Sequence, residues 1–250
     1  TDGQETEALL SMIALARVCG RASLERGQTA RDIRRTLTKL AMDGSSLRQA
    51  SALLALGVAD DRGQSTGQDP ALGTRSFLAR RAAEGSPARR TAAAIALGLT
   101  GDQERAEAVR SGLLSGGFQD RGARALAVAM LLDVPGLNTI RAELRSPLYR
   151  PYLTRDFATA LALAGDPLLV PLLIDRLVNA SFIPERVAAV QAFEWSSDPE
   201  AATAMLFVLT APRLGSKRID DTSRAFAASA LGTARRASCS VKSACRCRLE

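Results

Sequence analysis

The chain has 250 residues, of which 46% are hydrophobic and 24% are charged, a composition typical of globular proteins and unlike that of collagenous or disordered chains. Histidine is absent, aromatic residues make up only 4%, and 33 basic residues against 26 acidic ones give a formal net charge of +7. The lack of histidine excludes hydrolases with a histidine base, zinc metalloproteases with histidine ligands and histidine-containing zinc fingers.

Neither the apolar segments nor the cysteines point to a membrane protein or a disulfide-rich one. No apolar run reaches the roughly 18 to 20 residues that a membrane span needs. Four cysteines in a chain of this length are too few for a disulfide framework. We therefore predict a soluble protein without a membrane span, with a cytoplasmic location slightly favoured over an exported one.

Short alanine-rich segments, each ending in Leu-Gly or its equivalent, recur from residue 45 onward. Equivalent positions in these segments are Leu56, Leu97, Met130, Leu161, Phe193 and Leu231. The steps from Leu97 to Met130, Leu161 and Phe193 are 33, 31 and 32 residues. A regular spacing of this length predicts a repeat architecture.

Each repeat is predicted to contain two helices. The first, such as Ala92–Leu97, is apolar on nearly every side, which indicates burial between neighbours. The second is amphipathic, since Ala106, Val109 and Leu113 share one face of the predicted helix Gln103–Leu114. No alternating strand pattern occurs, so we predict an all-helical chain.

Several predicted helices begin with a capping residue followed by proline, whose fixed φ suits the first helical position. These starts are Asp69-Pro70, Ser86-Pro87, Asp166-Pro167 and Asp198-Pro199. Pro171 would remove a backbone hydrogen bond from a helix interior. The helix after Asp166 therefore either begins near residue 170 or is kinked.

The segments Leu97–Asp102 and Gly165–Ile174 resemble the HEAT repeat, in particular the short bacterial units first described in phycobilisome lyases. The resemblance covers about residues 45–233, with residues 1–44 as a divergent first helix pair. It implies an all-α fold, a right-handed α-α superhelix of the HEAT/armadillo type with about six helix pairs. The solenoid domain is then residues 1–234.

Two segments depart from the repeat pattern. An extra loop rich in glycine, aspartate and glutamine occupies Asp60–Thr74, as a tolerated insertion or as a contact loop. Residues 235–250 form an irregular basic tail that contains Cys239, Cys245 and Cys247. These three cysteines lack a fourth ligand for a closed structural zinc site, so we predict no metal site and reduced thiols.

Arginine accounts for 30 of the 33 basic residues. This bias reflects either a GC-rich coding sequence or recognition of phosphate and carboxylate groups by planar guanidinium groups. Acidic residues on the same second helices favour a mixed-charge, solvated face over a continuous basic track. The candidate partner-binding residues are Arg105, Arg110, Arg141, Arg145 and Arg176.

The repeats and the lack of a catalytic constellation favour a scaffold or adaptor that binds a protein partner on its concave face. We expect no enzyme activity, no catalytic residues and no cofactor, and Trp195 is expected to pack in the core beside Phe193. The alternative is a nucleic-acid-binding protein that uses the arginine track. DNA glycosylase-like and chromophore-lyase-like activities are minor options from the same resemblance, and the oligomeric state is left open.

Overall fold

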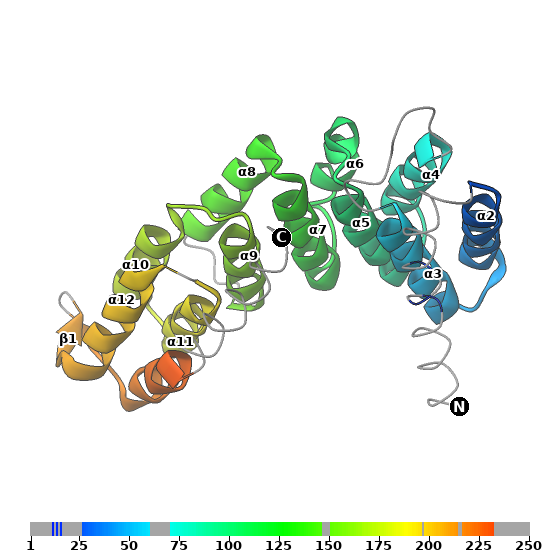
Figure 1. Cartoon of the computed structure of the whole chain (residues 1–250). Coiled ribbons are helices and arrows are strands. Elements are labelled where there is room, and N and C mark those ends of the chain that lie inside the picture. Colours follow the sequence, from blue (N-terminus) through cyan, green and yellow to red (C-terminus); the bar gives the residue numbers. More distant parts are fainter. Residues whose placement is uncertain are drawn as a thin grey trace. The chain divides into compact units, whose positions relative to one another are not determined.

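The computed structural model describes residues 12, 14, 16, 27–60, 71–146, 151–196, 198–214 and 217–232 (Figure 1). The chain divides into two compact units, Thr1–Leu137 and Asn138–Glu250, called unit 1 and unit 2 below. The tail 235–250, all four cysteines and most of the extra loop lie outside the described residues, and so does the predicted start Asp69-Pro70.

Unit 1 consists of helices in the described ranges. They are α2 (Gly27–Asp43), α3 (Ser46–Ala59), α4 (Ala71–Ala83), α5 (Pro87–Thr100), the 3-10 helix η1 (Gln103–Arg105), α6 (Ala106–Arg110) and α7 (Phe118–Leu131). The helix α8 (Val134–Arg145) begins in unit 1 and ends in unit 2.

Unit 2 continues the helical pattern. Its further elements are α9 (Pro151–Leu163), α10 (Leu169–Asn179), α11 (Ile183–Ala192), the 3-10 helix η2 (Phe193–Trp195), α12 (Pro199–Thr210), strands β1 (Arg213–Leu214) and β2 (Lys217–Arg218), and a helix over residues 221–232. The predicted all-α repeat fold is confirmed. One element was not predicted: β1 and β2 form a short antiparallel hairpin. None of the described helices combines the length and hydrophobicity needed to cross a membrane.

Alternating helices of the chain form an inner row in unit 1. We call α3, α5, α7, α9 and α11 the first helices, and α4, α6, α8, α10 and α12 the second helices. In unit 1, α3 packs on α5 and α5 packs on α7 (Figure 1). A Cβ on Gly57 would lie 2.5 Å from the Cα of Ala96, and one on Gly98 would lie 2.9 Å from the Cα of Ala127. The alanine and glycine content of these helices thus allows their backbones to approach closely.

The second helix of the α5 repeat is shorter than the sequence predicts. Ala106, Val109 and Leu113 are buried as expected, but the regular helix ends at Arg110. Turns follow, and a Cβ on Gly112 would lie 2.3 Å from the guanidinium carbon of Arg124. The chain therefore leaves the helix where the Arg124 side chain needs space.

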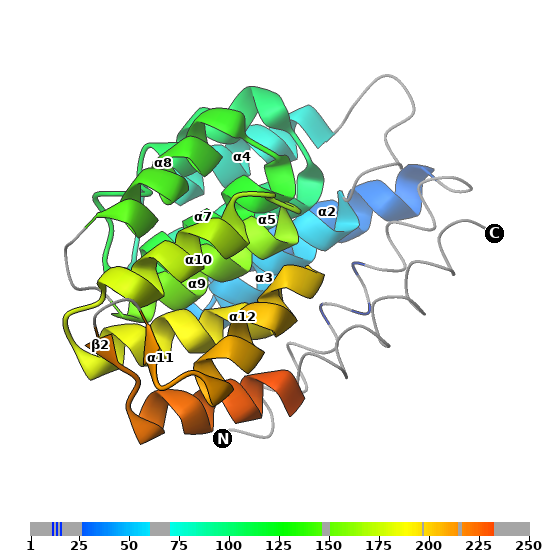
Figure 2. The ribbon, with the colours of Figure 1, turned by 90° about the vertical axis from the view of Figure 1, so that its left-hand side faces the viewer.

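The core of unit 2 joins its last elements. Leu177 of α10, Val190 of α11 and Val208 of α12 are buried in one cluster with Ile219 and Ala227. Figure 2 shows α10, α11 and α12 together, with the final helix beside them. Residues from four helices and from the segment after the hairpin thus share one apolar core.

The predicted capping chemistry is found at one of the three predicted helix starts that the structure describes. The side chain of Asp198 accepts a hydrogen bond from the Glu200 amide at 2.9 Å. Ser86 occupies the cap position of α5, but its side chain makes no capping hydrogen bond.

The predicted start Asp166-Pro167 is wrong, because α10 begins at Leu169 and its cap position is Leu168. Pro171 is the third residue of α10, in the first turn, where the missing amide leaves no helix hydrogen bond unmade. The expectation of a helix start near residue 170 is confirmed.

Candidate interaction surface

An aspartate stands at the turn after several first helices. We call Asp60, Asp102, Asp133 and Asp166 the turn aspartates. Asp102 accepts from the Glu104 amide at 3.1 Å, Asp133 from the Gly136 amide at 3.1 Å and Asp166 from the Leu168 amide at 2.9 Å. Each of these three carboxylates therefore supports the backbone that leads into the next helix.

Three turn aspartates also bind an arginine from the helix that precedes the first helix of their repeat. Arg110 of α6 donates to Asp133 at 2.7 Å. Arg141 of α8 donates to Asp166 at 2.7 Å through Nε. In the same way, Arg34 of α2 lies 3.6 Å from Asp60, which also accepts from Arg75 of α4 at 3.0 Å. We call these contacts the Asp–Arg pairs.

Asp102 differs because its arginine comes from its own turn. Arg105 forms an ion pair with Asp102 and also donates to the Ser76 hydroxyl of α4 at 3.0 Å. The second contact still reaches back to the preceding second helix. The predicted binding residue Arg105 therefore joins two neighbouring repeats, as Arg110 and Arg141 do.

The last two predicted arginines have opposite environments. Arg176 is buried, and it donates to the carbonyl groups of Leu144 and Ser146 at 2.8 and 2.7 Å and lies 3.3 Å from Glu185. Arg145 at the end of α8 is exposed. Of the five predicted contact residues, four thus bind groups of their own chain, and their role in partner binding stays a prediction.

Neighbouring carboxylates stabilise the charged form of Arg110. A hydrogen bond to Glu107 is the main cause that raises the pKa of Arg110, burial opposes the shift, and the charge of Asp133 adds to it. Arg110 therefore stays protonated at any physiological pH, bound to two carboxylates. Its charge offers little to an external phosphate or carboxylate.

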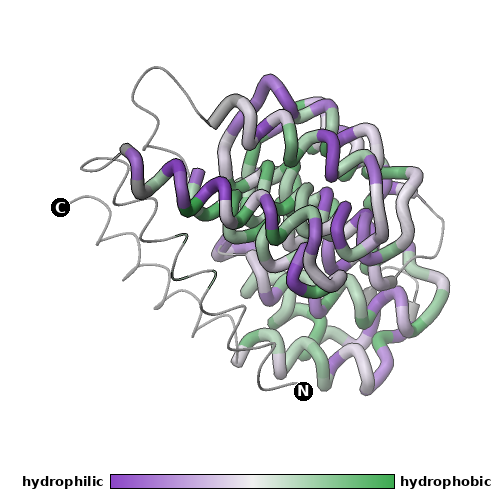
Figure 3. The backbone as a smooth tube through the Cα atoms, turned by 90° about the vertical axis from the view of Figure 1, so that its right-hand side faces the viewer, coloured by the Kyte–Doolittle hydropathy of each residue, from purple (hydrophilic) through white to green (hydrophobic). Residues whose placement is uncertain are grey.

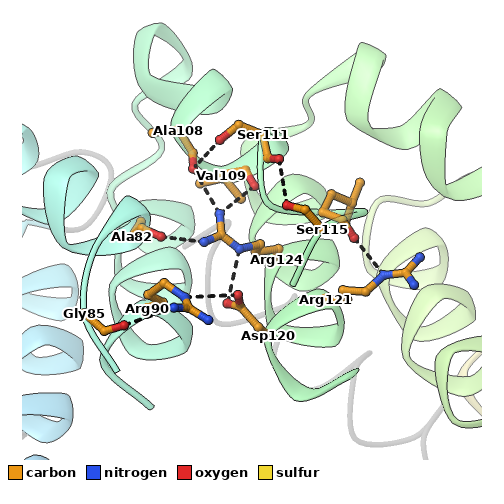
Figure 4. A network of polar contacts seen from close by, with 11 residues as sticks. Ala82, Gly85, Arg90, Ala108, Val109, Ser111, Ser115, Asp120, Arg121 and Arg124 are labelled. Atoms are coloured by element: carbon orange, nitrogen blue, oxygen red, sulfur yellow. Dashed lines mark hydrogen bonds and ion pairs between the residues drawn. The ribbon is translucent and has the colours of Figure 1, made fainter. Parts of the chain in front are cut away.

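A second group of buried arginines connects α7 to its neighbours (Figure 4). Arg124 donates to Asp120 at 3.2 Å and to the carbonyl groups of Ala108 and Val109 at 3.0 Å each, and it also reaches the carbonyl of Ala82. Arg90 of α5 donates to the other oxygen of Asp120 at 3.3 Å. The carbonyl groups at the ends of α4 and α6 carry partial negative charge, so the buried guanidinium is well placed there. This network holds α4, α5, α6 and α7 together.

Large apolar side chains are exposed in both units, and most of the exposed aromatic ones lie in unit 2. Among the aromatic residues that the structure describes, five are more than half exposed: Phe118, Tyr152, Phe182, Trp195 and Phe207. Four of these five belong to unit 2. Exposed Ile174 of α10 and Leu206 of α12 add to them.

The expectation that Trp195 packs in the core is wrong. Phe193 is fully buried, whereas Trp195 is 55% exposed. The two residues lie two positions apart in η2, and this spacing turns their side chains to different sides of the helix. Only one of them can then face the core.

Comparisons with known proteins assign no family and no activity. No family model matches the chain, and no curated protein matches it. Among solved structures, human deoxyhypusine hydroxylase in complex with glycerol is similar over 91% of this chain and 98% of its own, with 14% identity and a TM-score of 0.33.

The expectation that the chain is not an enzyme is corrected by this match. The similar structure is that of an enzyme. A fold by itself does not fix function, so a helical repeat fold is compatible with an enzyme as well as with a scaffold. At this low identity and TM-score, the match assigns no reaction and no substrate to this chain.

Proposed function

We propose that this chain is a HEAT-type helical-repeat protein that binds a protein partner through unit 2. The contact residues are exposed side chains of the second helices α10 and α12 and of adjoining turns. They are Ile174, Phe182, Trp195, Leu206 and Phe207. The observation that carries the proposal is the exposed apolar face of α12.

The helix α12 is apolar on opposite sides. Ala201, Met205 and Val208 are buried and face unit 2, while Leu206 and Phe207 are about half exposed. A helix that is hydrophobic all round is normally buried on all sides. One side of α12 packs in the core of unit 2, and the partner covers the other side.

The exposed residue types also suit an interface. Aromatic residues are enriched at protein interfaces and often carry most of the binding energy there. Burial of apolar surface contributes about 25 cal/mol for each Å². Trp195 is 55% exposed and Phe207 is 51% exposed, so these two residues are the strongest candidates for anchoring residues.

Site-specific photocrosslinking in the source cell tests the proposal. A photoreactive phenylalanine analogue at Phe207 or Trp195 is expected to crosslink one and the same protein. The control position is Arg80, an exposed residue of α4 in unit 1. Crosslinks that are absent at Phe207 and Trp195, or equally strong at Arg80, would contradict the proposal.

The nucleic-acid alternative predicts a different result. Phosphate contacts give an affinity that falls steeply with salt concentration. A titration of labelled duplex DNA at two salt concentrations separates the alternatives. Arg105, Arg110 and Arg141 bind carboxylates of the chain. We therefore expect that any DNA binding is unaffected when these three arginines are replaced.

A further inference from the structure

Unit 1 contains an open pocket of about 310 Å³ between α2 and α4, which neighbour each other in Figure 1. Its lining residues are Arg31, Arg34, Arg35, Thr38, Gly73, Thr74 and Phe77. The volume lies at the lower end of the range for small-molecule sites, about 300 to 1,000 Å³. The pocket lies in unit 1 and shares no residue with the contact surface proposed for unit 2, so its proposed role does not depend on the proposed function.

The lining of this α2–α4 pocket is strongly cationic. Three guanidinium groups come from α2, on whose tube hydrophilic and hydrophobic residues interleave (Figure 3). Arg34 is held at 3.6 Å from Asp60, which is buried. Arg35 has one exposed carboxylate neighbour, Asp32, at 3.6 Å. Arg31 has no hydrogen-bond or ion-pair partner in the described part of the chain.

The carboxylates nearby do not cancel this charge. Asp60 is shared between Arg34 and Arg75, and Asp32 contacts Arg35 across an exposed surface, where a salt bridge contributes little. Counted over the residues that the structure describes, at least one positive charge in the pocket thus lacks a counterion. Planar guanidinium groups bind carboxylate and phosphate oxygens in pairs, which makes an oxyanion the matching ligand group.

The opposite wall of the pocket is apolar. Phe77 of α4 is mostly buried, and the guanidinium of Arg81 lies 5.2 Å from its ring centroid, which fixes the ring. The Thr38 hydroxyl of α2 donates to the carbonyl of Arg34 at 2.8 Å, so it does not donate to an oxyanion, which the arginines alone must hold. An anion with a compact apolar body matches both walls.

Gly73 leaves the pocket open from the side of α4. A Cβ at this position would have no atom within 4 Å, and the backbone φ is not in the left-handed region. A larger side chain at residue 73 therefore fits the helix and projects into free space. Replacement of Gly73 gives a way to fill the pocket without a clash in the fold.

We propose that the α2–α4 pocket binds a small organic oxyanion, a carboxylate or phosphate ester on a compact apolar body. Arg31 and Arg35 hold the oxyanion, and Phe77 contacts the apolar part. No bond is formed or broken in this step. The binding is a recognition event that is separate from the protein contact proposed for unit 2.

Calorimetric titration of the full chain with phenyl phosphate and with benzoate tests the proposal. At least one of the two is expected to bind with one-to-one stoichiometry, and the better one identifies the oxyanion. Inorganic phosphate and the neutral benzyl alcohol are each expected to bind at least about tenfold more weakly, since each lacks one half of the ligand. Absence of binding by both aromatic anions would overturn the proposal.

Variants locate the binding in the pocket. The double variant Arg31→Gln, Arg35→Gln and the pocket-filling variant Gly73→Leu are each expected to weaken binding at least about tenfold. Arg80→Gln removes an exposed charge of α4 outside the pocket and is expected to leave binding unchanged. An equal loss in Arg80→Gln, or full binding by Gly73→Leu with its helical circular dichroism retained, would overturn the assignment.

Discussion

At the scale of single residues, aspartates at helix starts combine capping with ion pairing. Asp220 precedes the helix over residues 221–232 and accepts from the amide and the hydroxyl of Ser223, both at 2.8 Å. Arg186 of α11 lies 3.1 Å from the same carboxylate. Burial by itself would raise the pKa of Asp220, but the hydrogen bonds from Ser223 and the charge of Arg186 outweigh it and lower the pKa.

A lowered pKa in the folded state predicts a definite pH dependence. The ionised Asp220 stabilises the fold above its unfolded pKa, about 3.9, and this contribution is lost as the pH falls through the lower folded value. The variant Asp220→Asn is expected to be about 1 kcal/mol less stable at pH 7. Urea unfolding at pH 7 and near pH 3 should show that the difference shrinks in acid.

Asp156 of α9 gives the matched control with the opposite sign. Burial raises the pKa of Asp156, and the charge of Arg155 only partly offsets this effect. The ionised carboxylate therefore costs stability at neutral pH, and Asp156→Asn is expected to be as stable as the wild type or slightly more so. A large loss of stability in Asp156→Asn at pH 7, with no loss in Asp220→Asn, would contradict both assignments.

Local spacing predicts which residues are buried, but it does not predict contacts between residues far apart in the chain. Burial of Ala106, Val109 and Leu113 followed from their spacing, because helical periodicity alone fixes a shared face. The partner of Arg110 did not follow, since Asp133 lies 23 residues away and is brought close only by the fold. The exposure of Trp195 could have been inferred from its spacing to the buried Phe193.

At the scale of elements, the Asp–Arg pairs link each turn to a helix of the preceding repeat. The sequence predicted the capping aspartates, which are local features, but it placed the same arginines in a contact surface. The Asp166 carboxylate is 1% exposed, so its charge depends on Arg141 for compensation. Removal of one partner from such a buried pair is costly, because it leaves an uncompensated charge.

The variant Arg141→Ala is therefore expected to destabilise the protein by about 2–3 kcal/mol. Its matched control is Arg145→Ala, which removes an exposed arginine of the same helix and is expected to change stability by less than about 0.5 kcal/mol. Chemical denaturation followed by circular dichroism measures both. Equal stability of the two variants would show that the pair of Arg141 and Asp166 does not support the fold.

At the scale of the whole molecule, the predicted helical repeats are present, and the chain divides into two compact units at Leu137. The repeat spacing predicted the alternation of first and second helices. It could not predict this division, because the periodicity continues through α8, which spans the boundary. In repeat proteins, stability arises from each repeat and its direct neighbours.

A core truncation in unit 1 should thus act locally. Leu97 of α5 is fully buried, and Leu97→Ala is expected to cost about 2–5 kcal/mol. Hydrogen exchange is expected to show reduced protection in α3 and α7, which pack on α5, and little change in α10 and α12. A uniform loss of protection across both units would contradict local coupling.

The proposed function depends on which residues face the partner. Exposed aromatic side chains of unit 2 supply the contact in this account, while most of the predicted arginines support the fold. Phe207 and Arg145 are both exposed, so replacing either leaves the core intact and separates the two alternatives.

The most direct test is the dissociation constant of the crosslinked partner, measured with purified proteins for Phe207→Ser and Arg145→Ala. We predict that Phe207→Ser raises the Kd at least about tenfold, as expected for an anchoring residue, and that Arg145→Ala changes it less than about twofold. A Kd that is unchanged in Phe207→Ser but strongly raised in Arg145→Ala would contradict the account and favour partner binding by the predicted arginines.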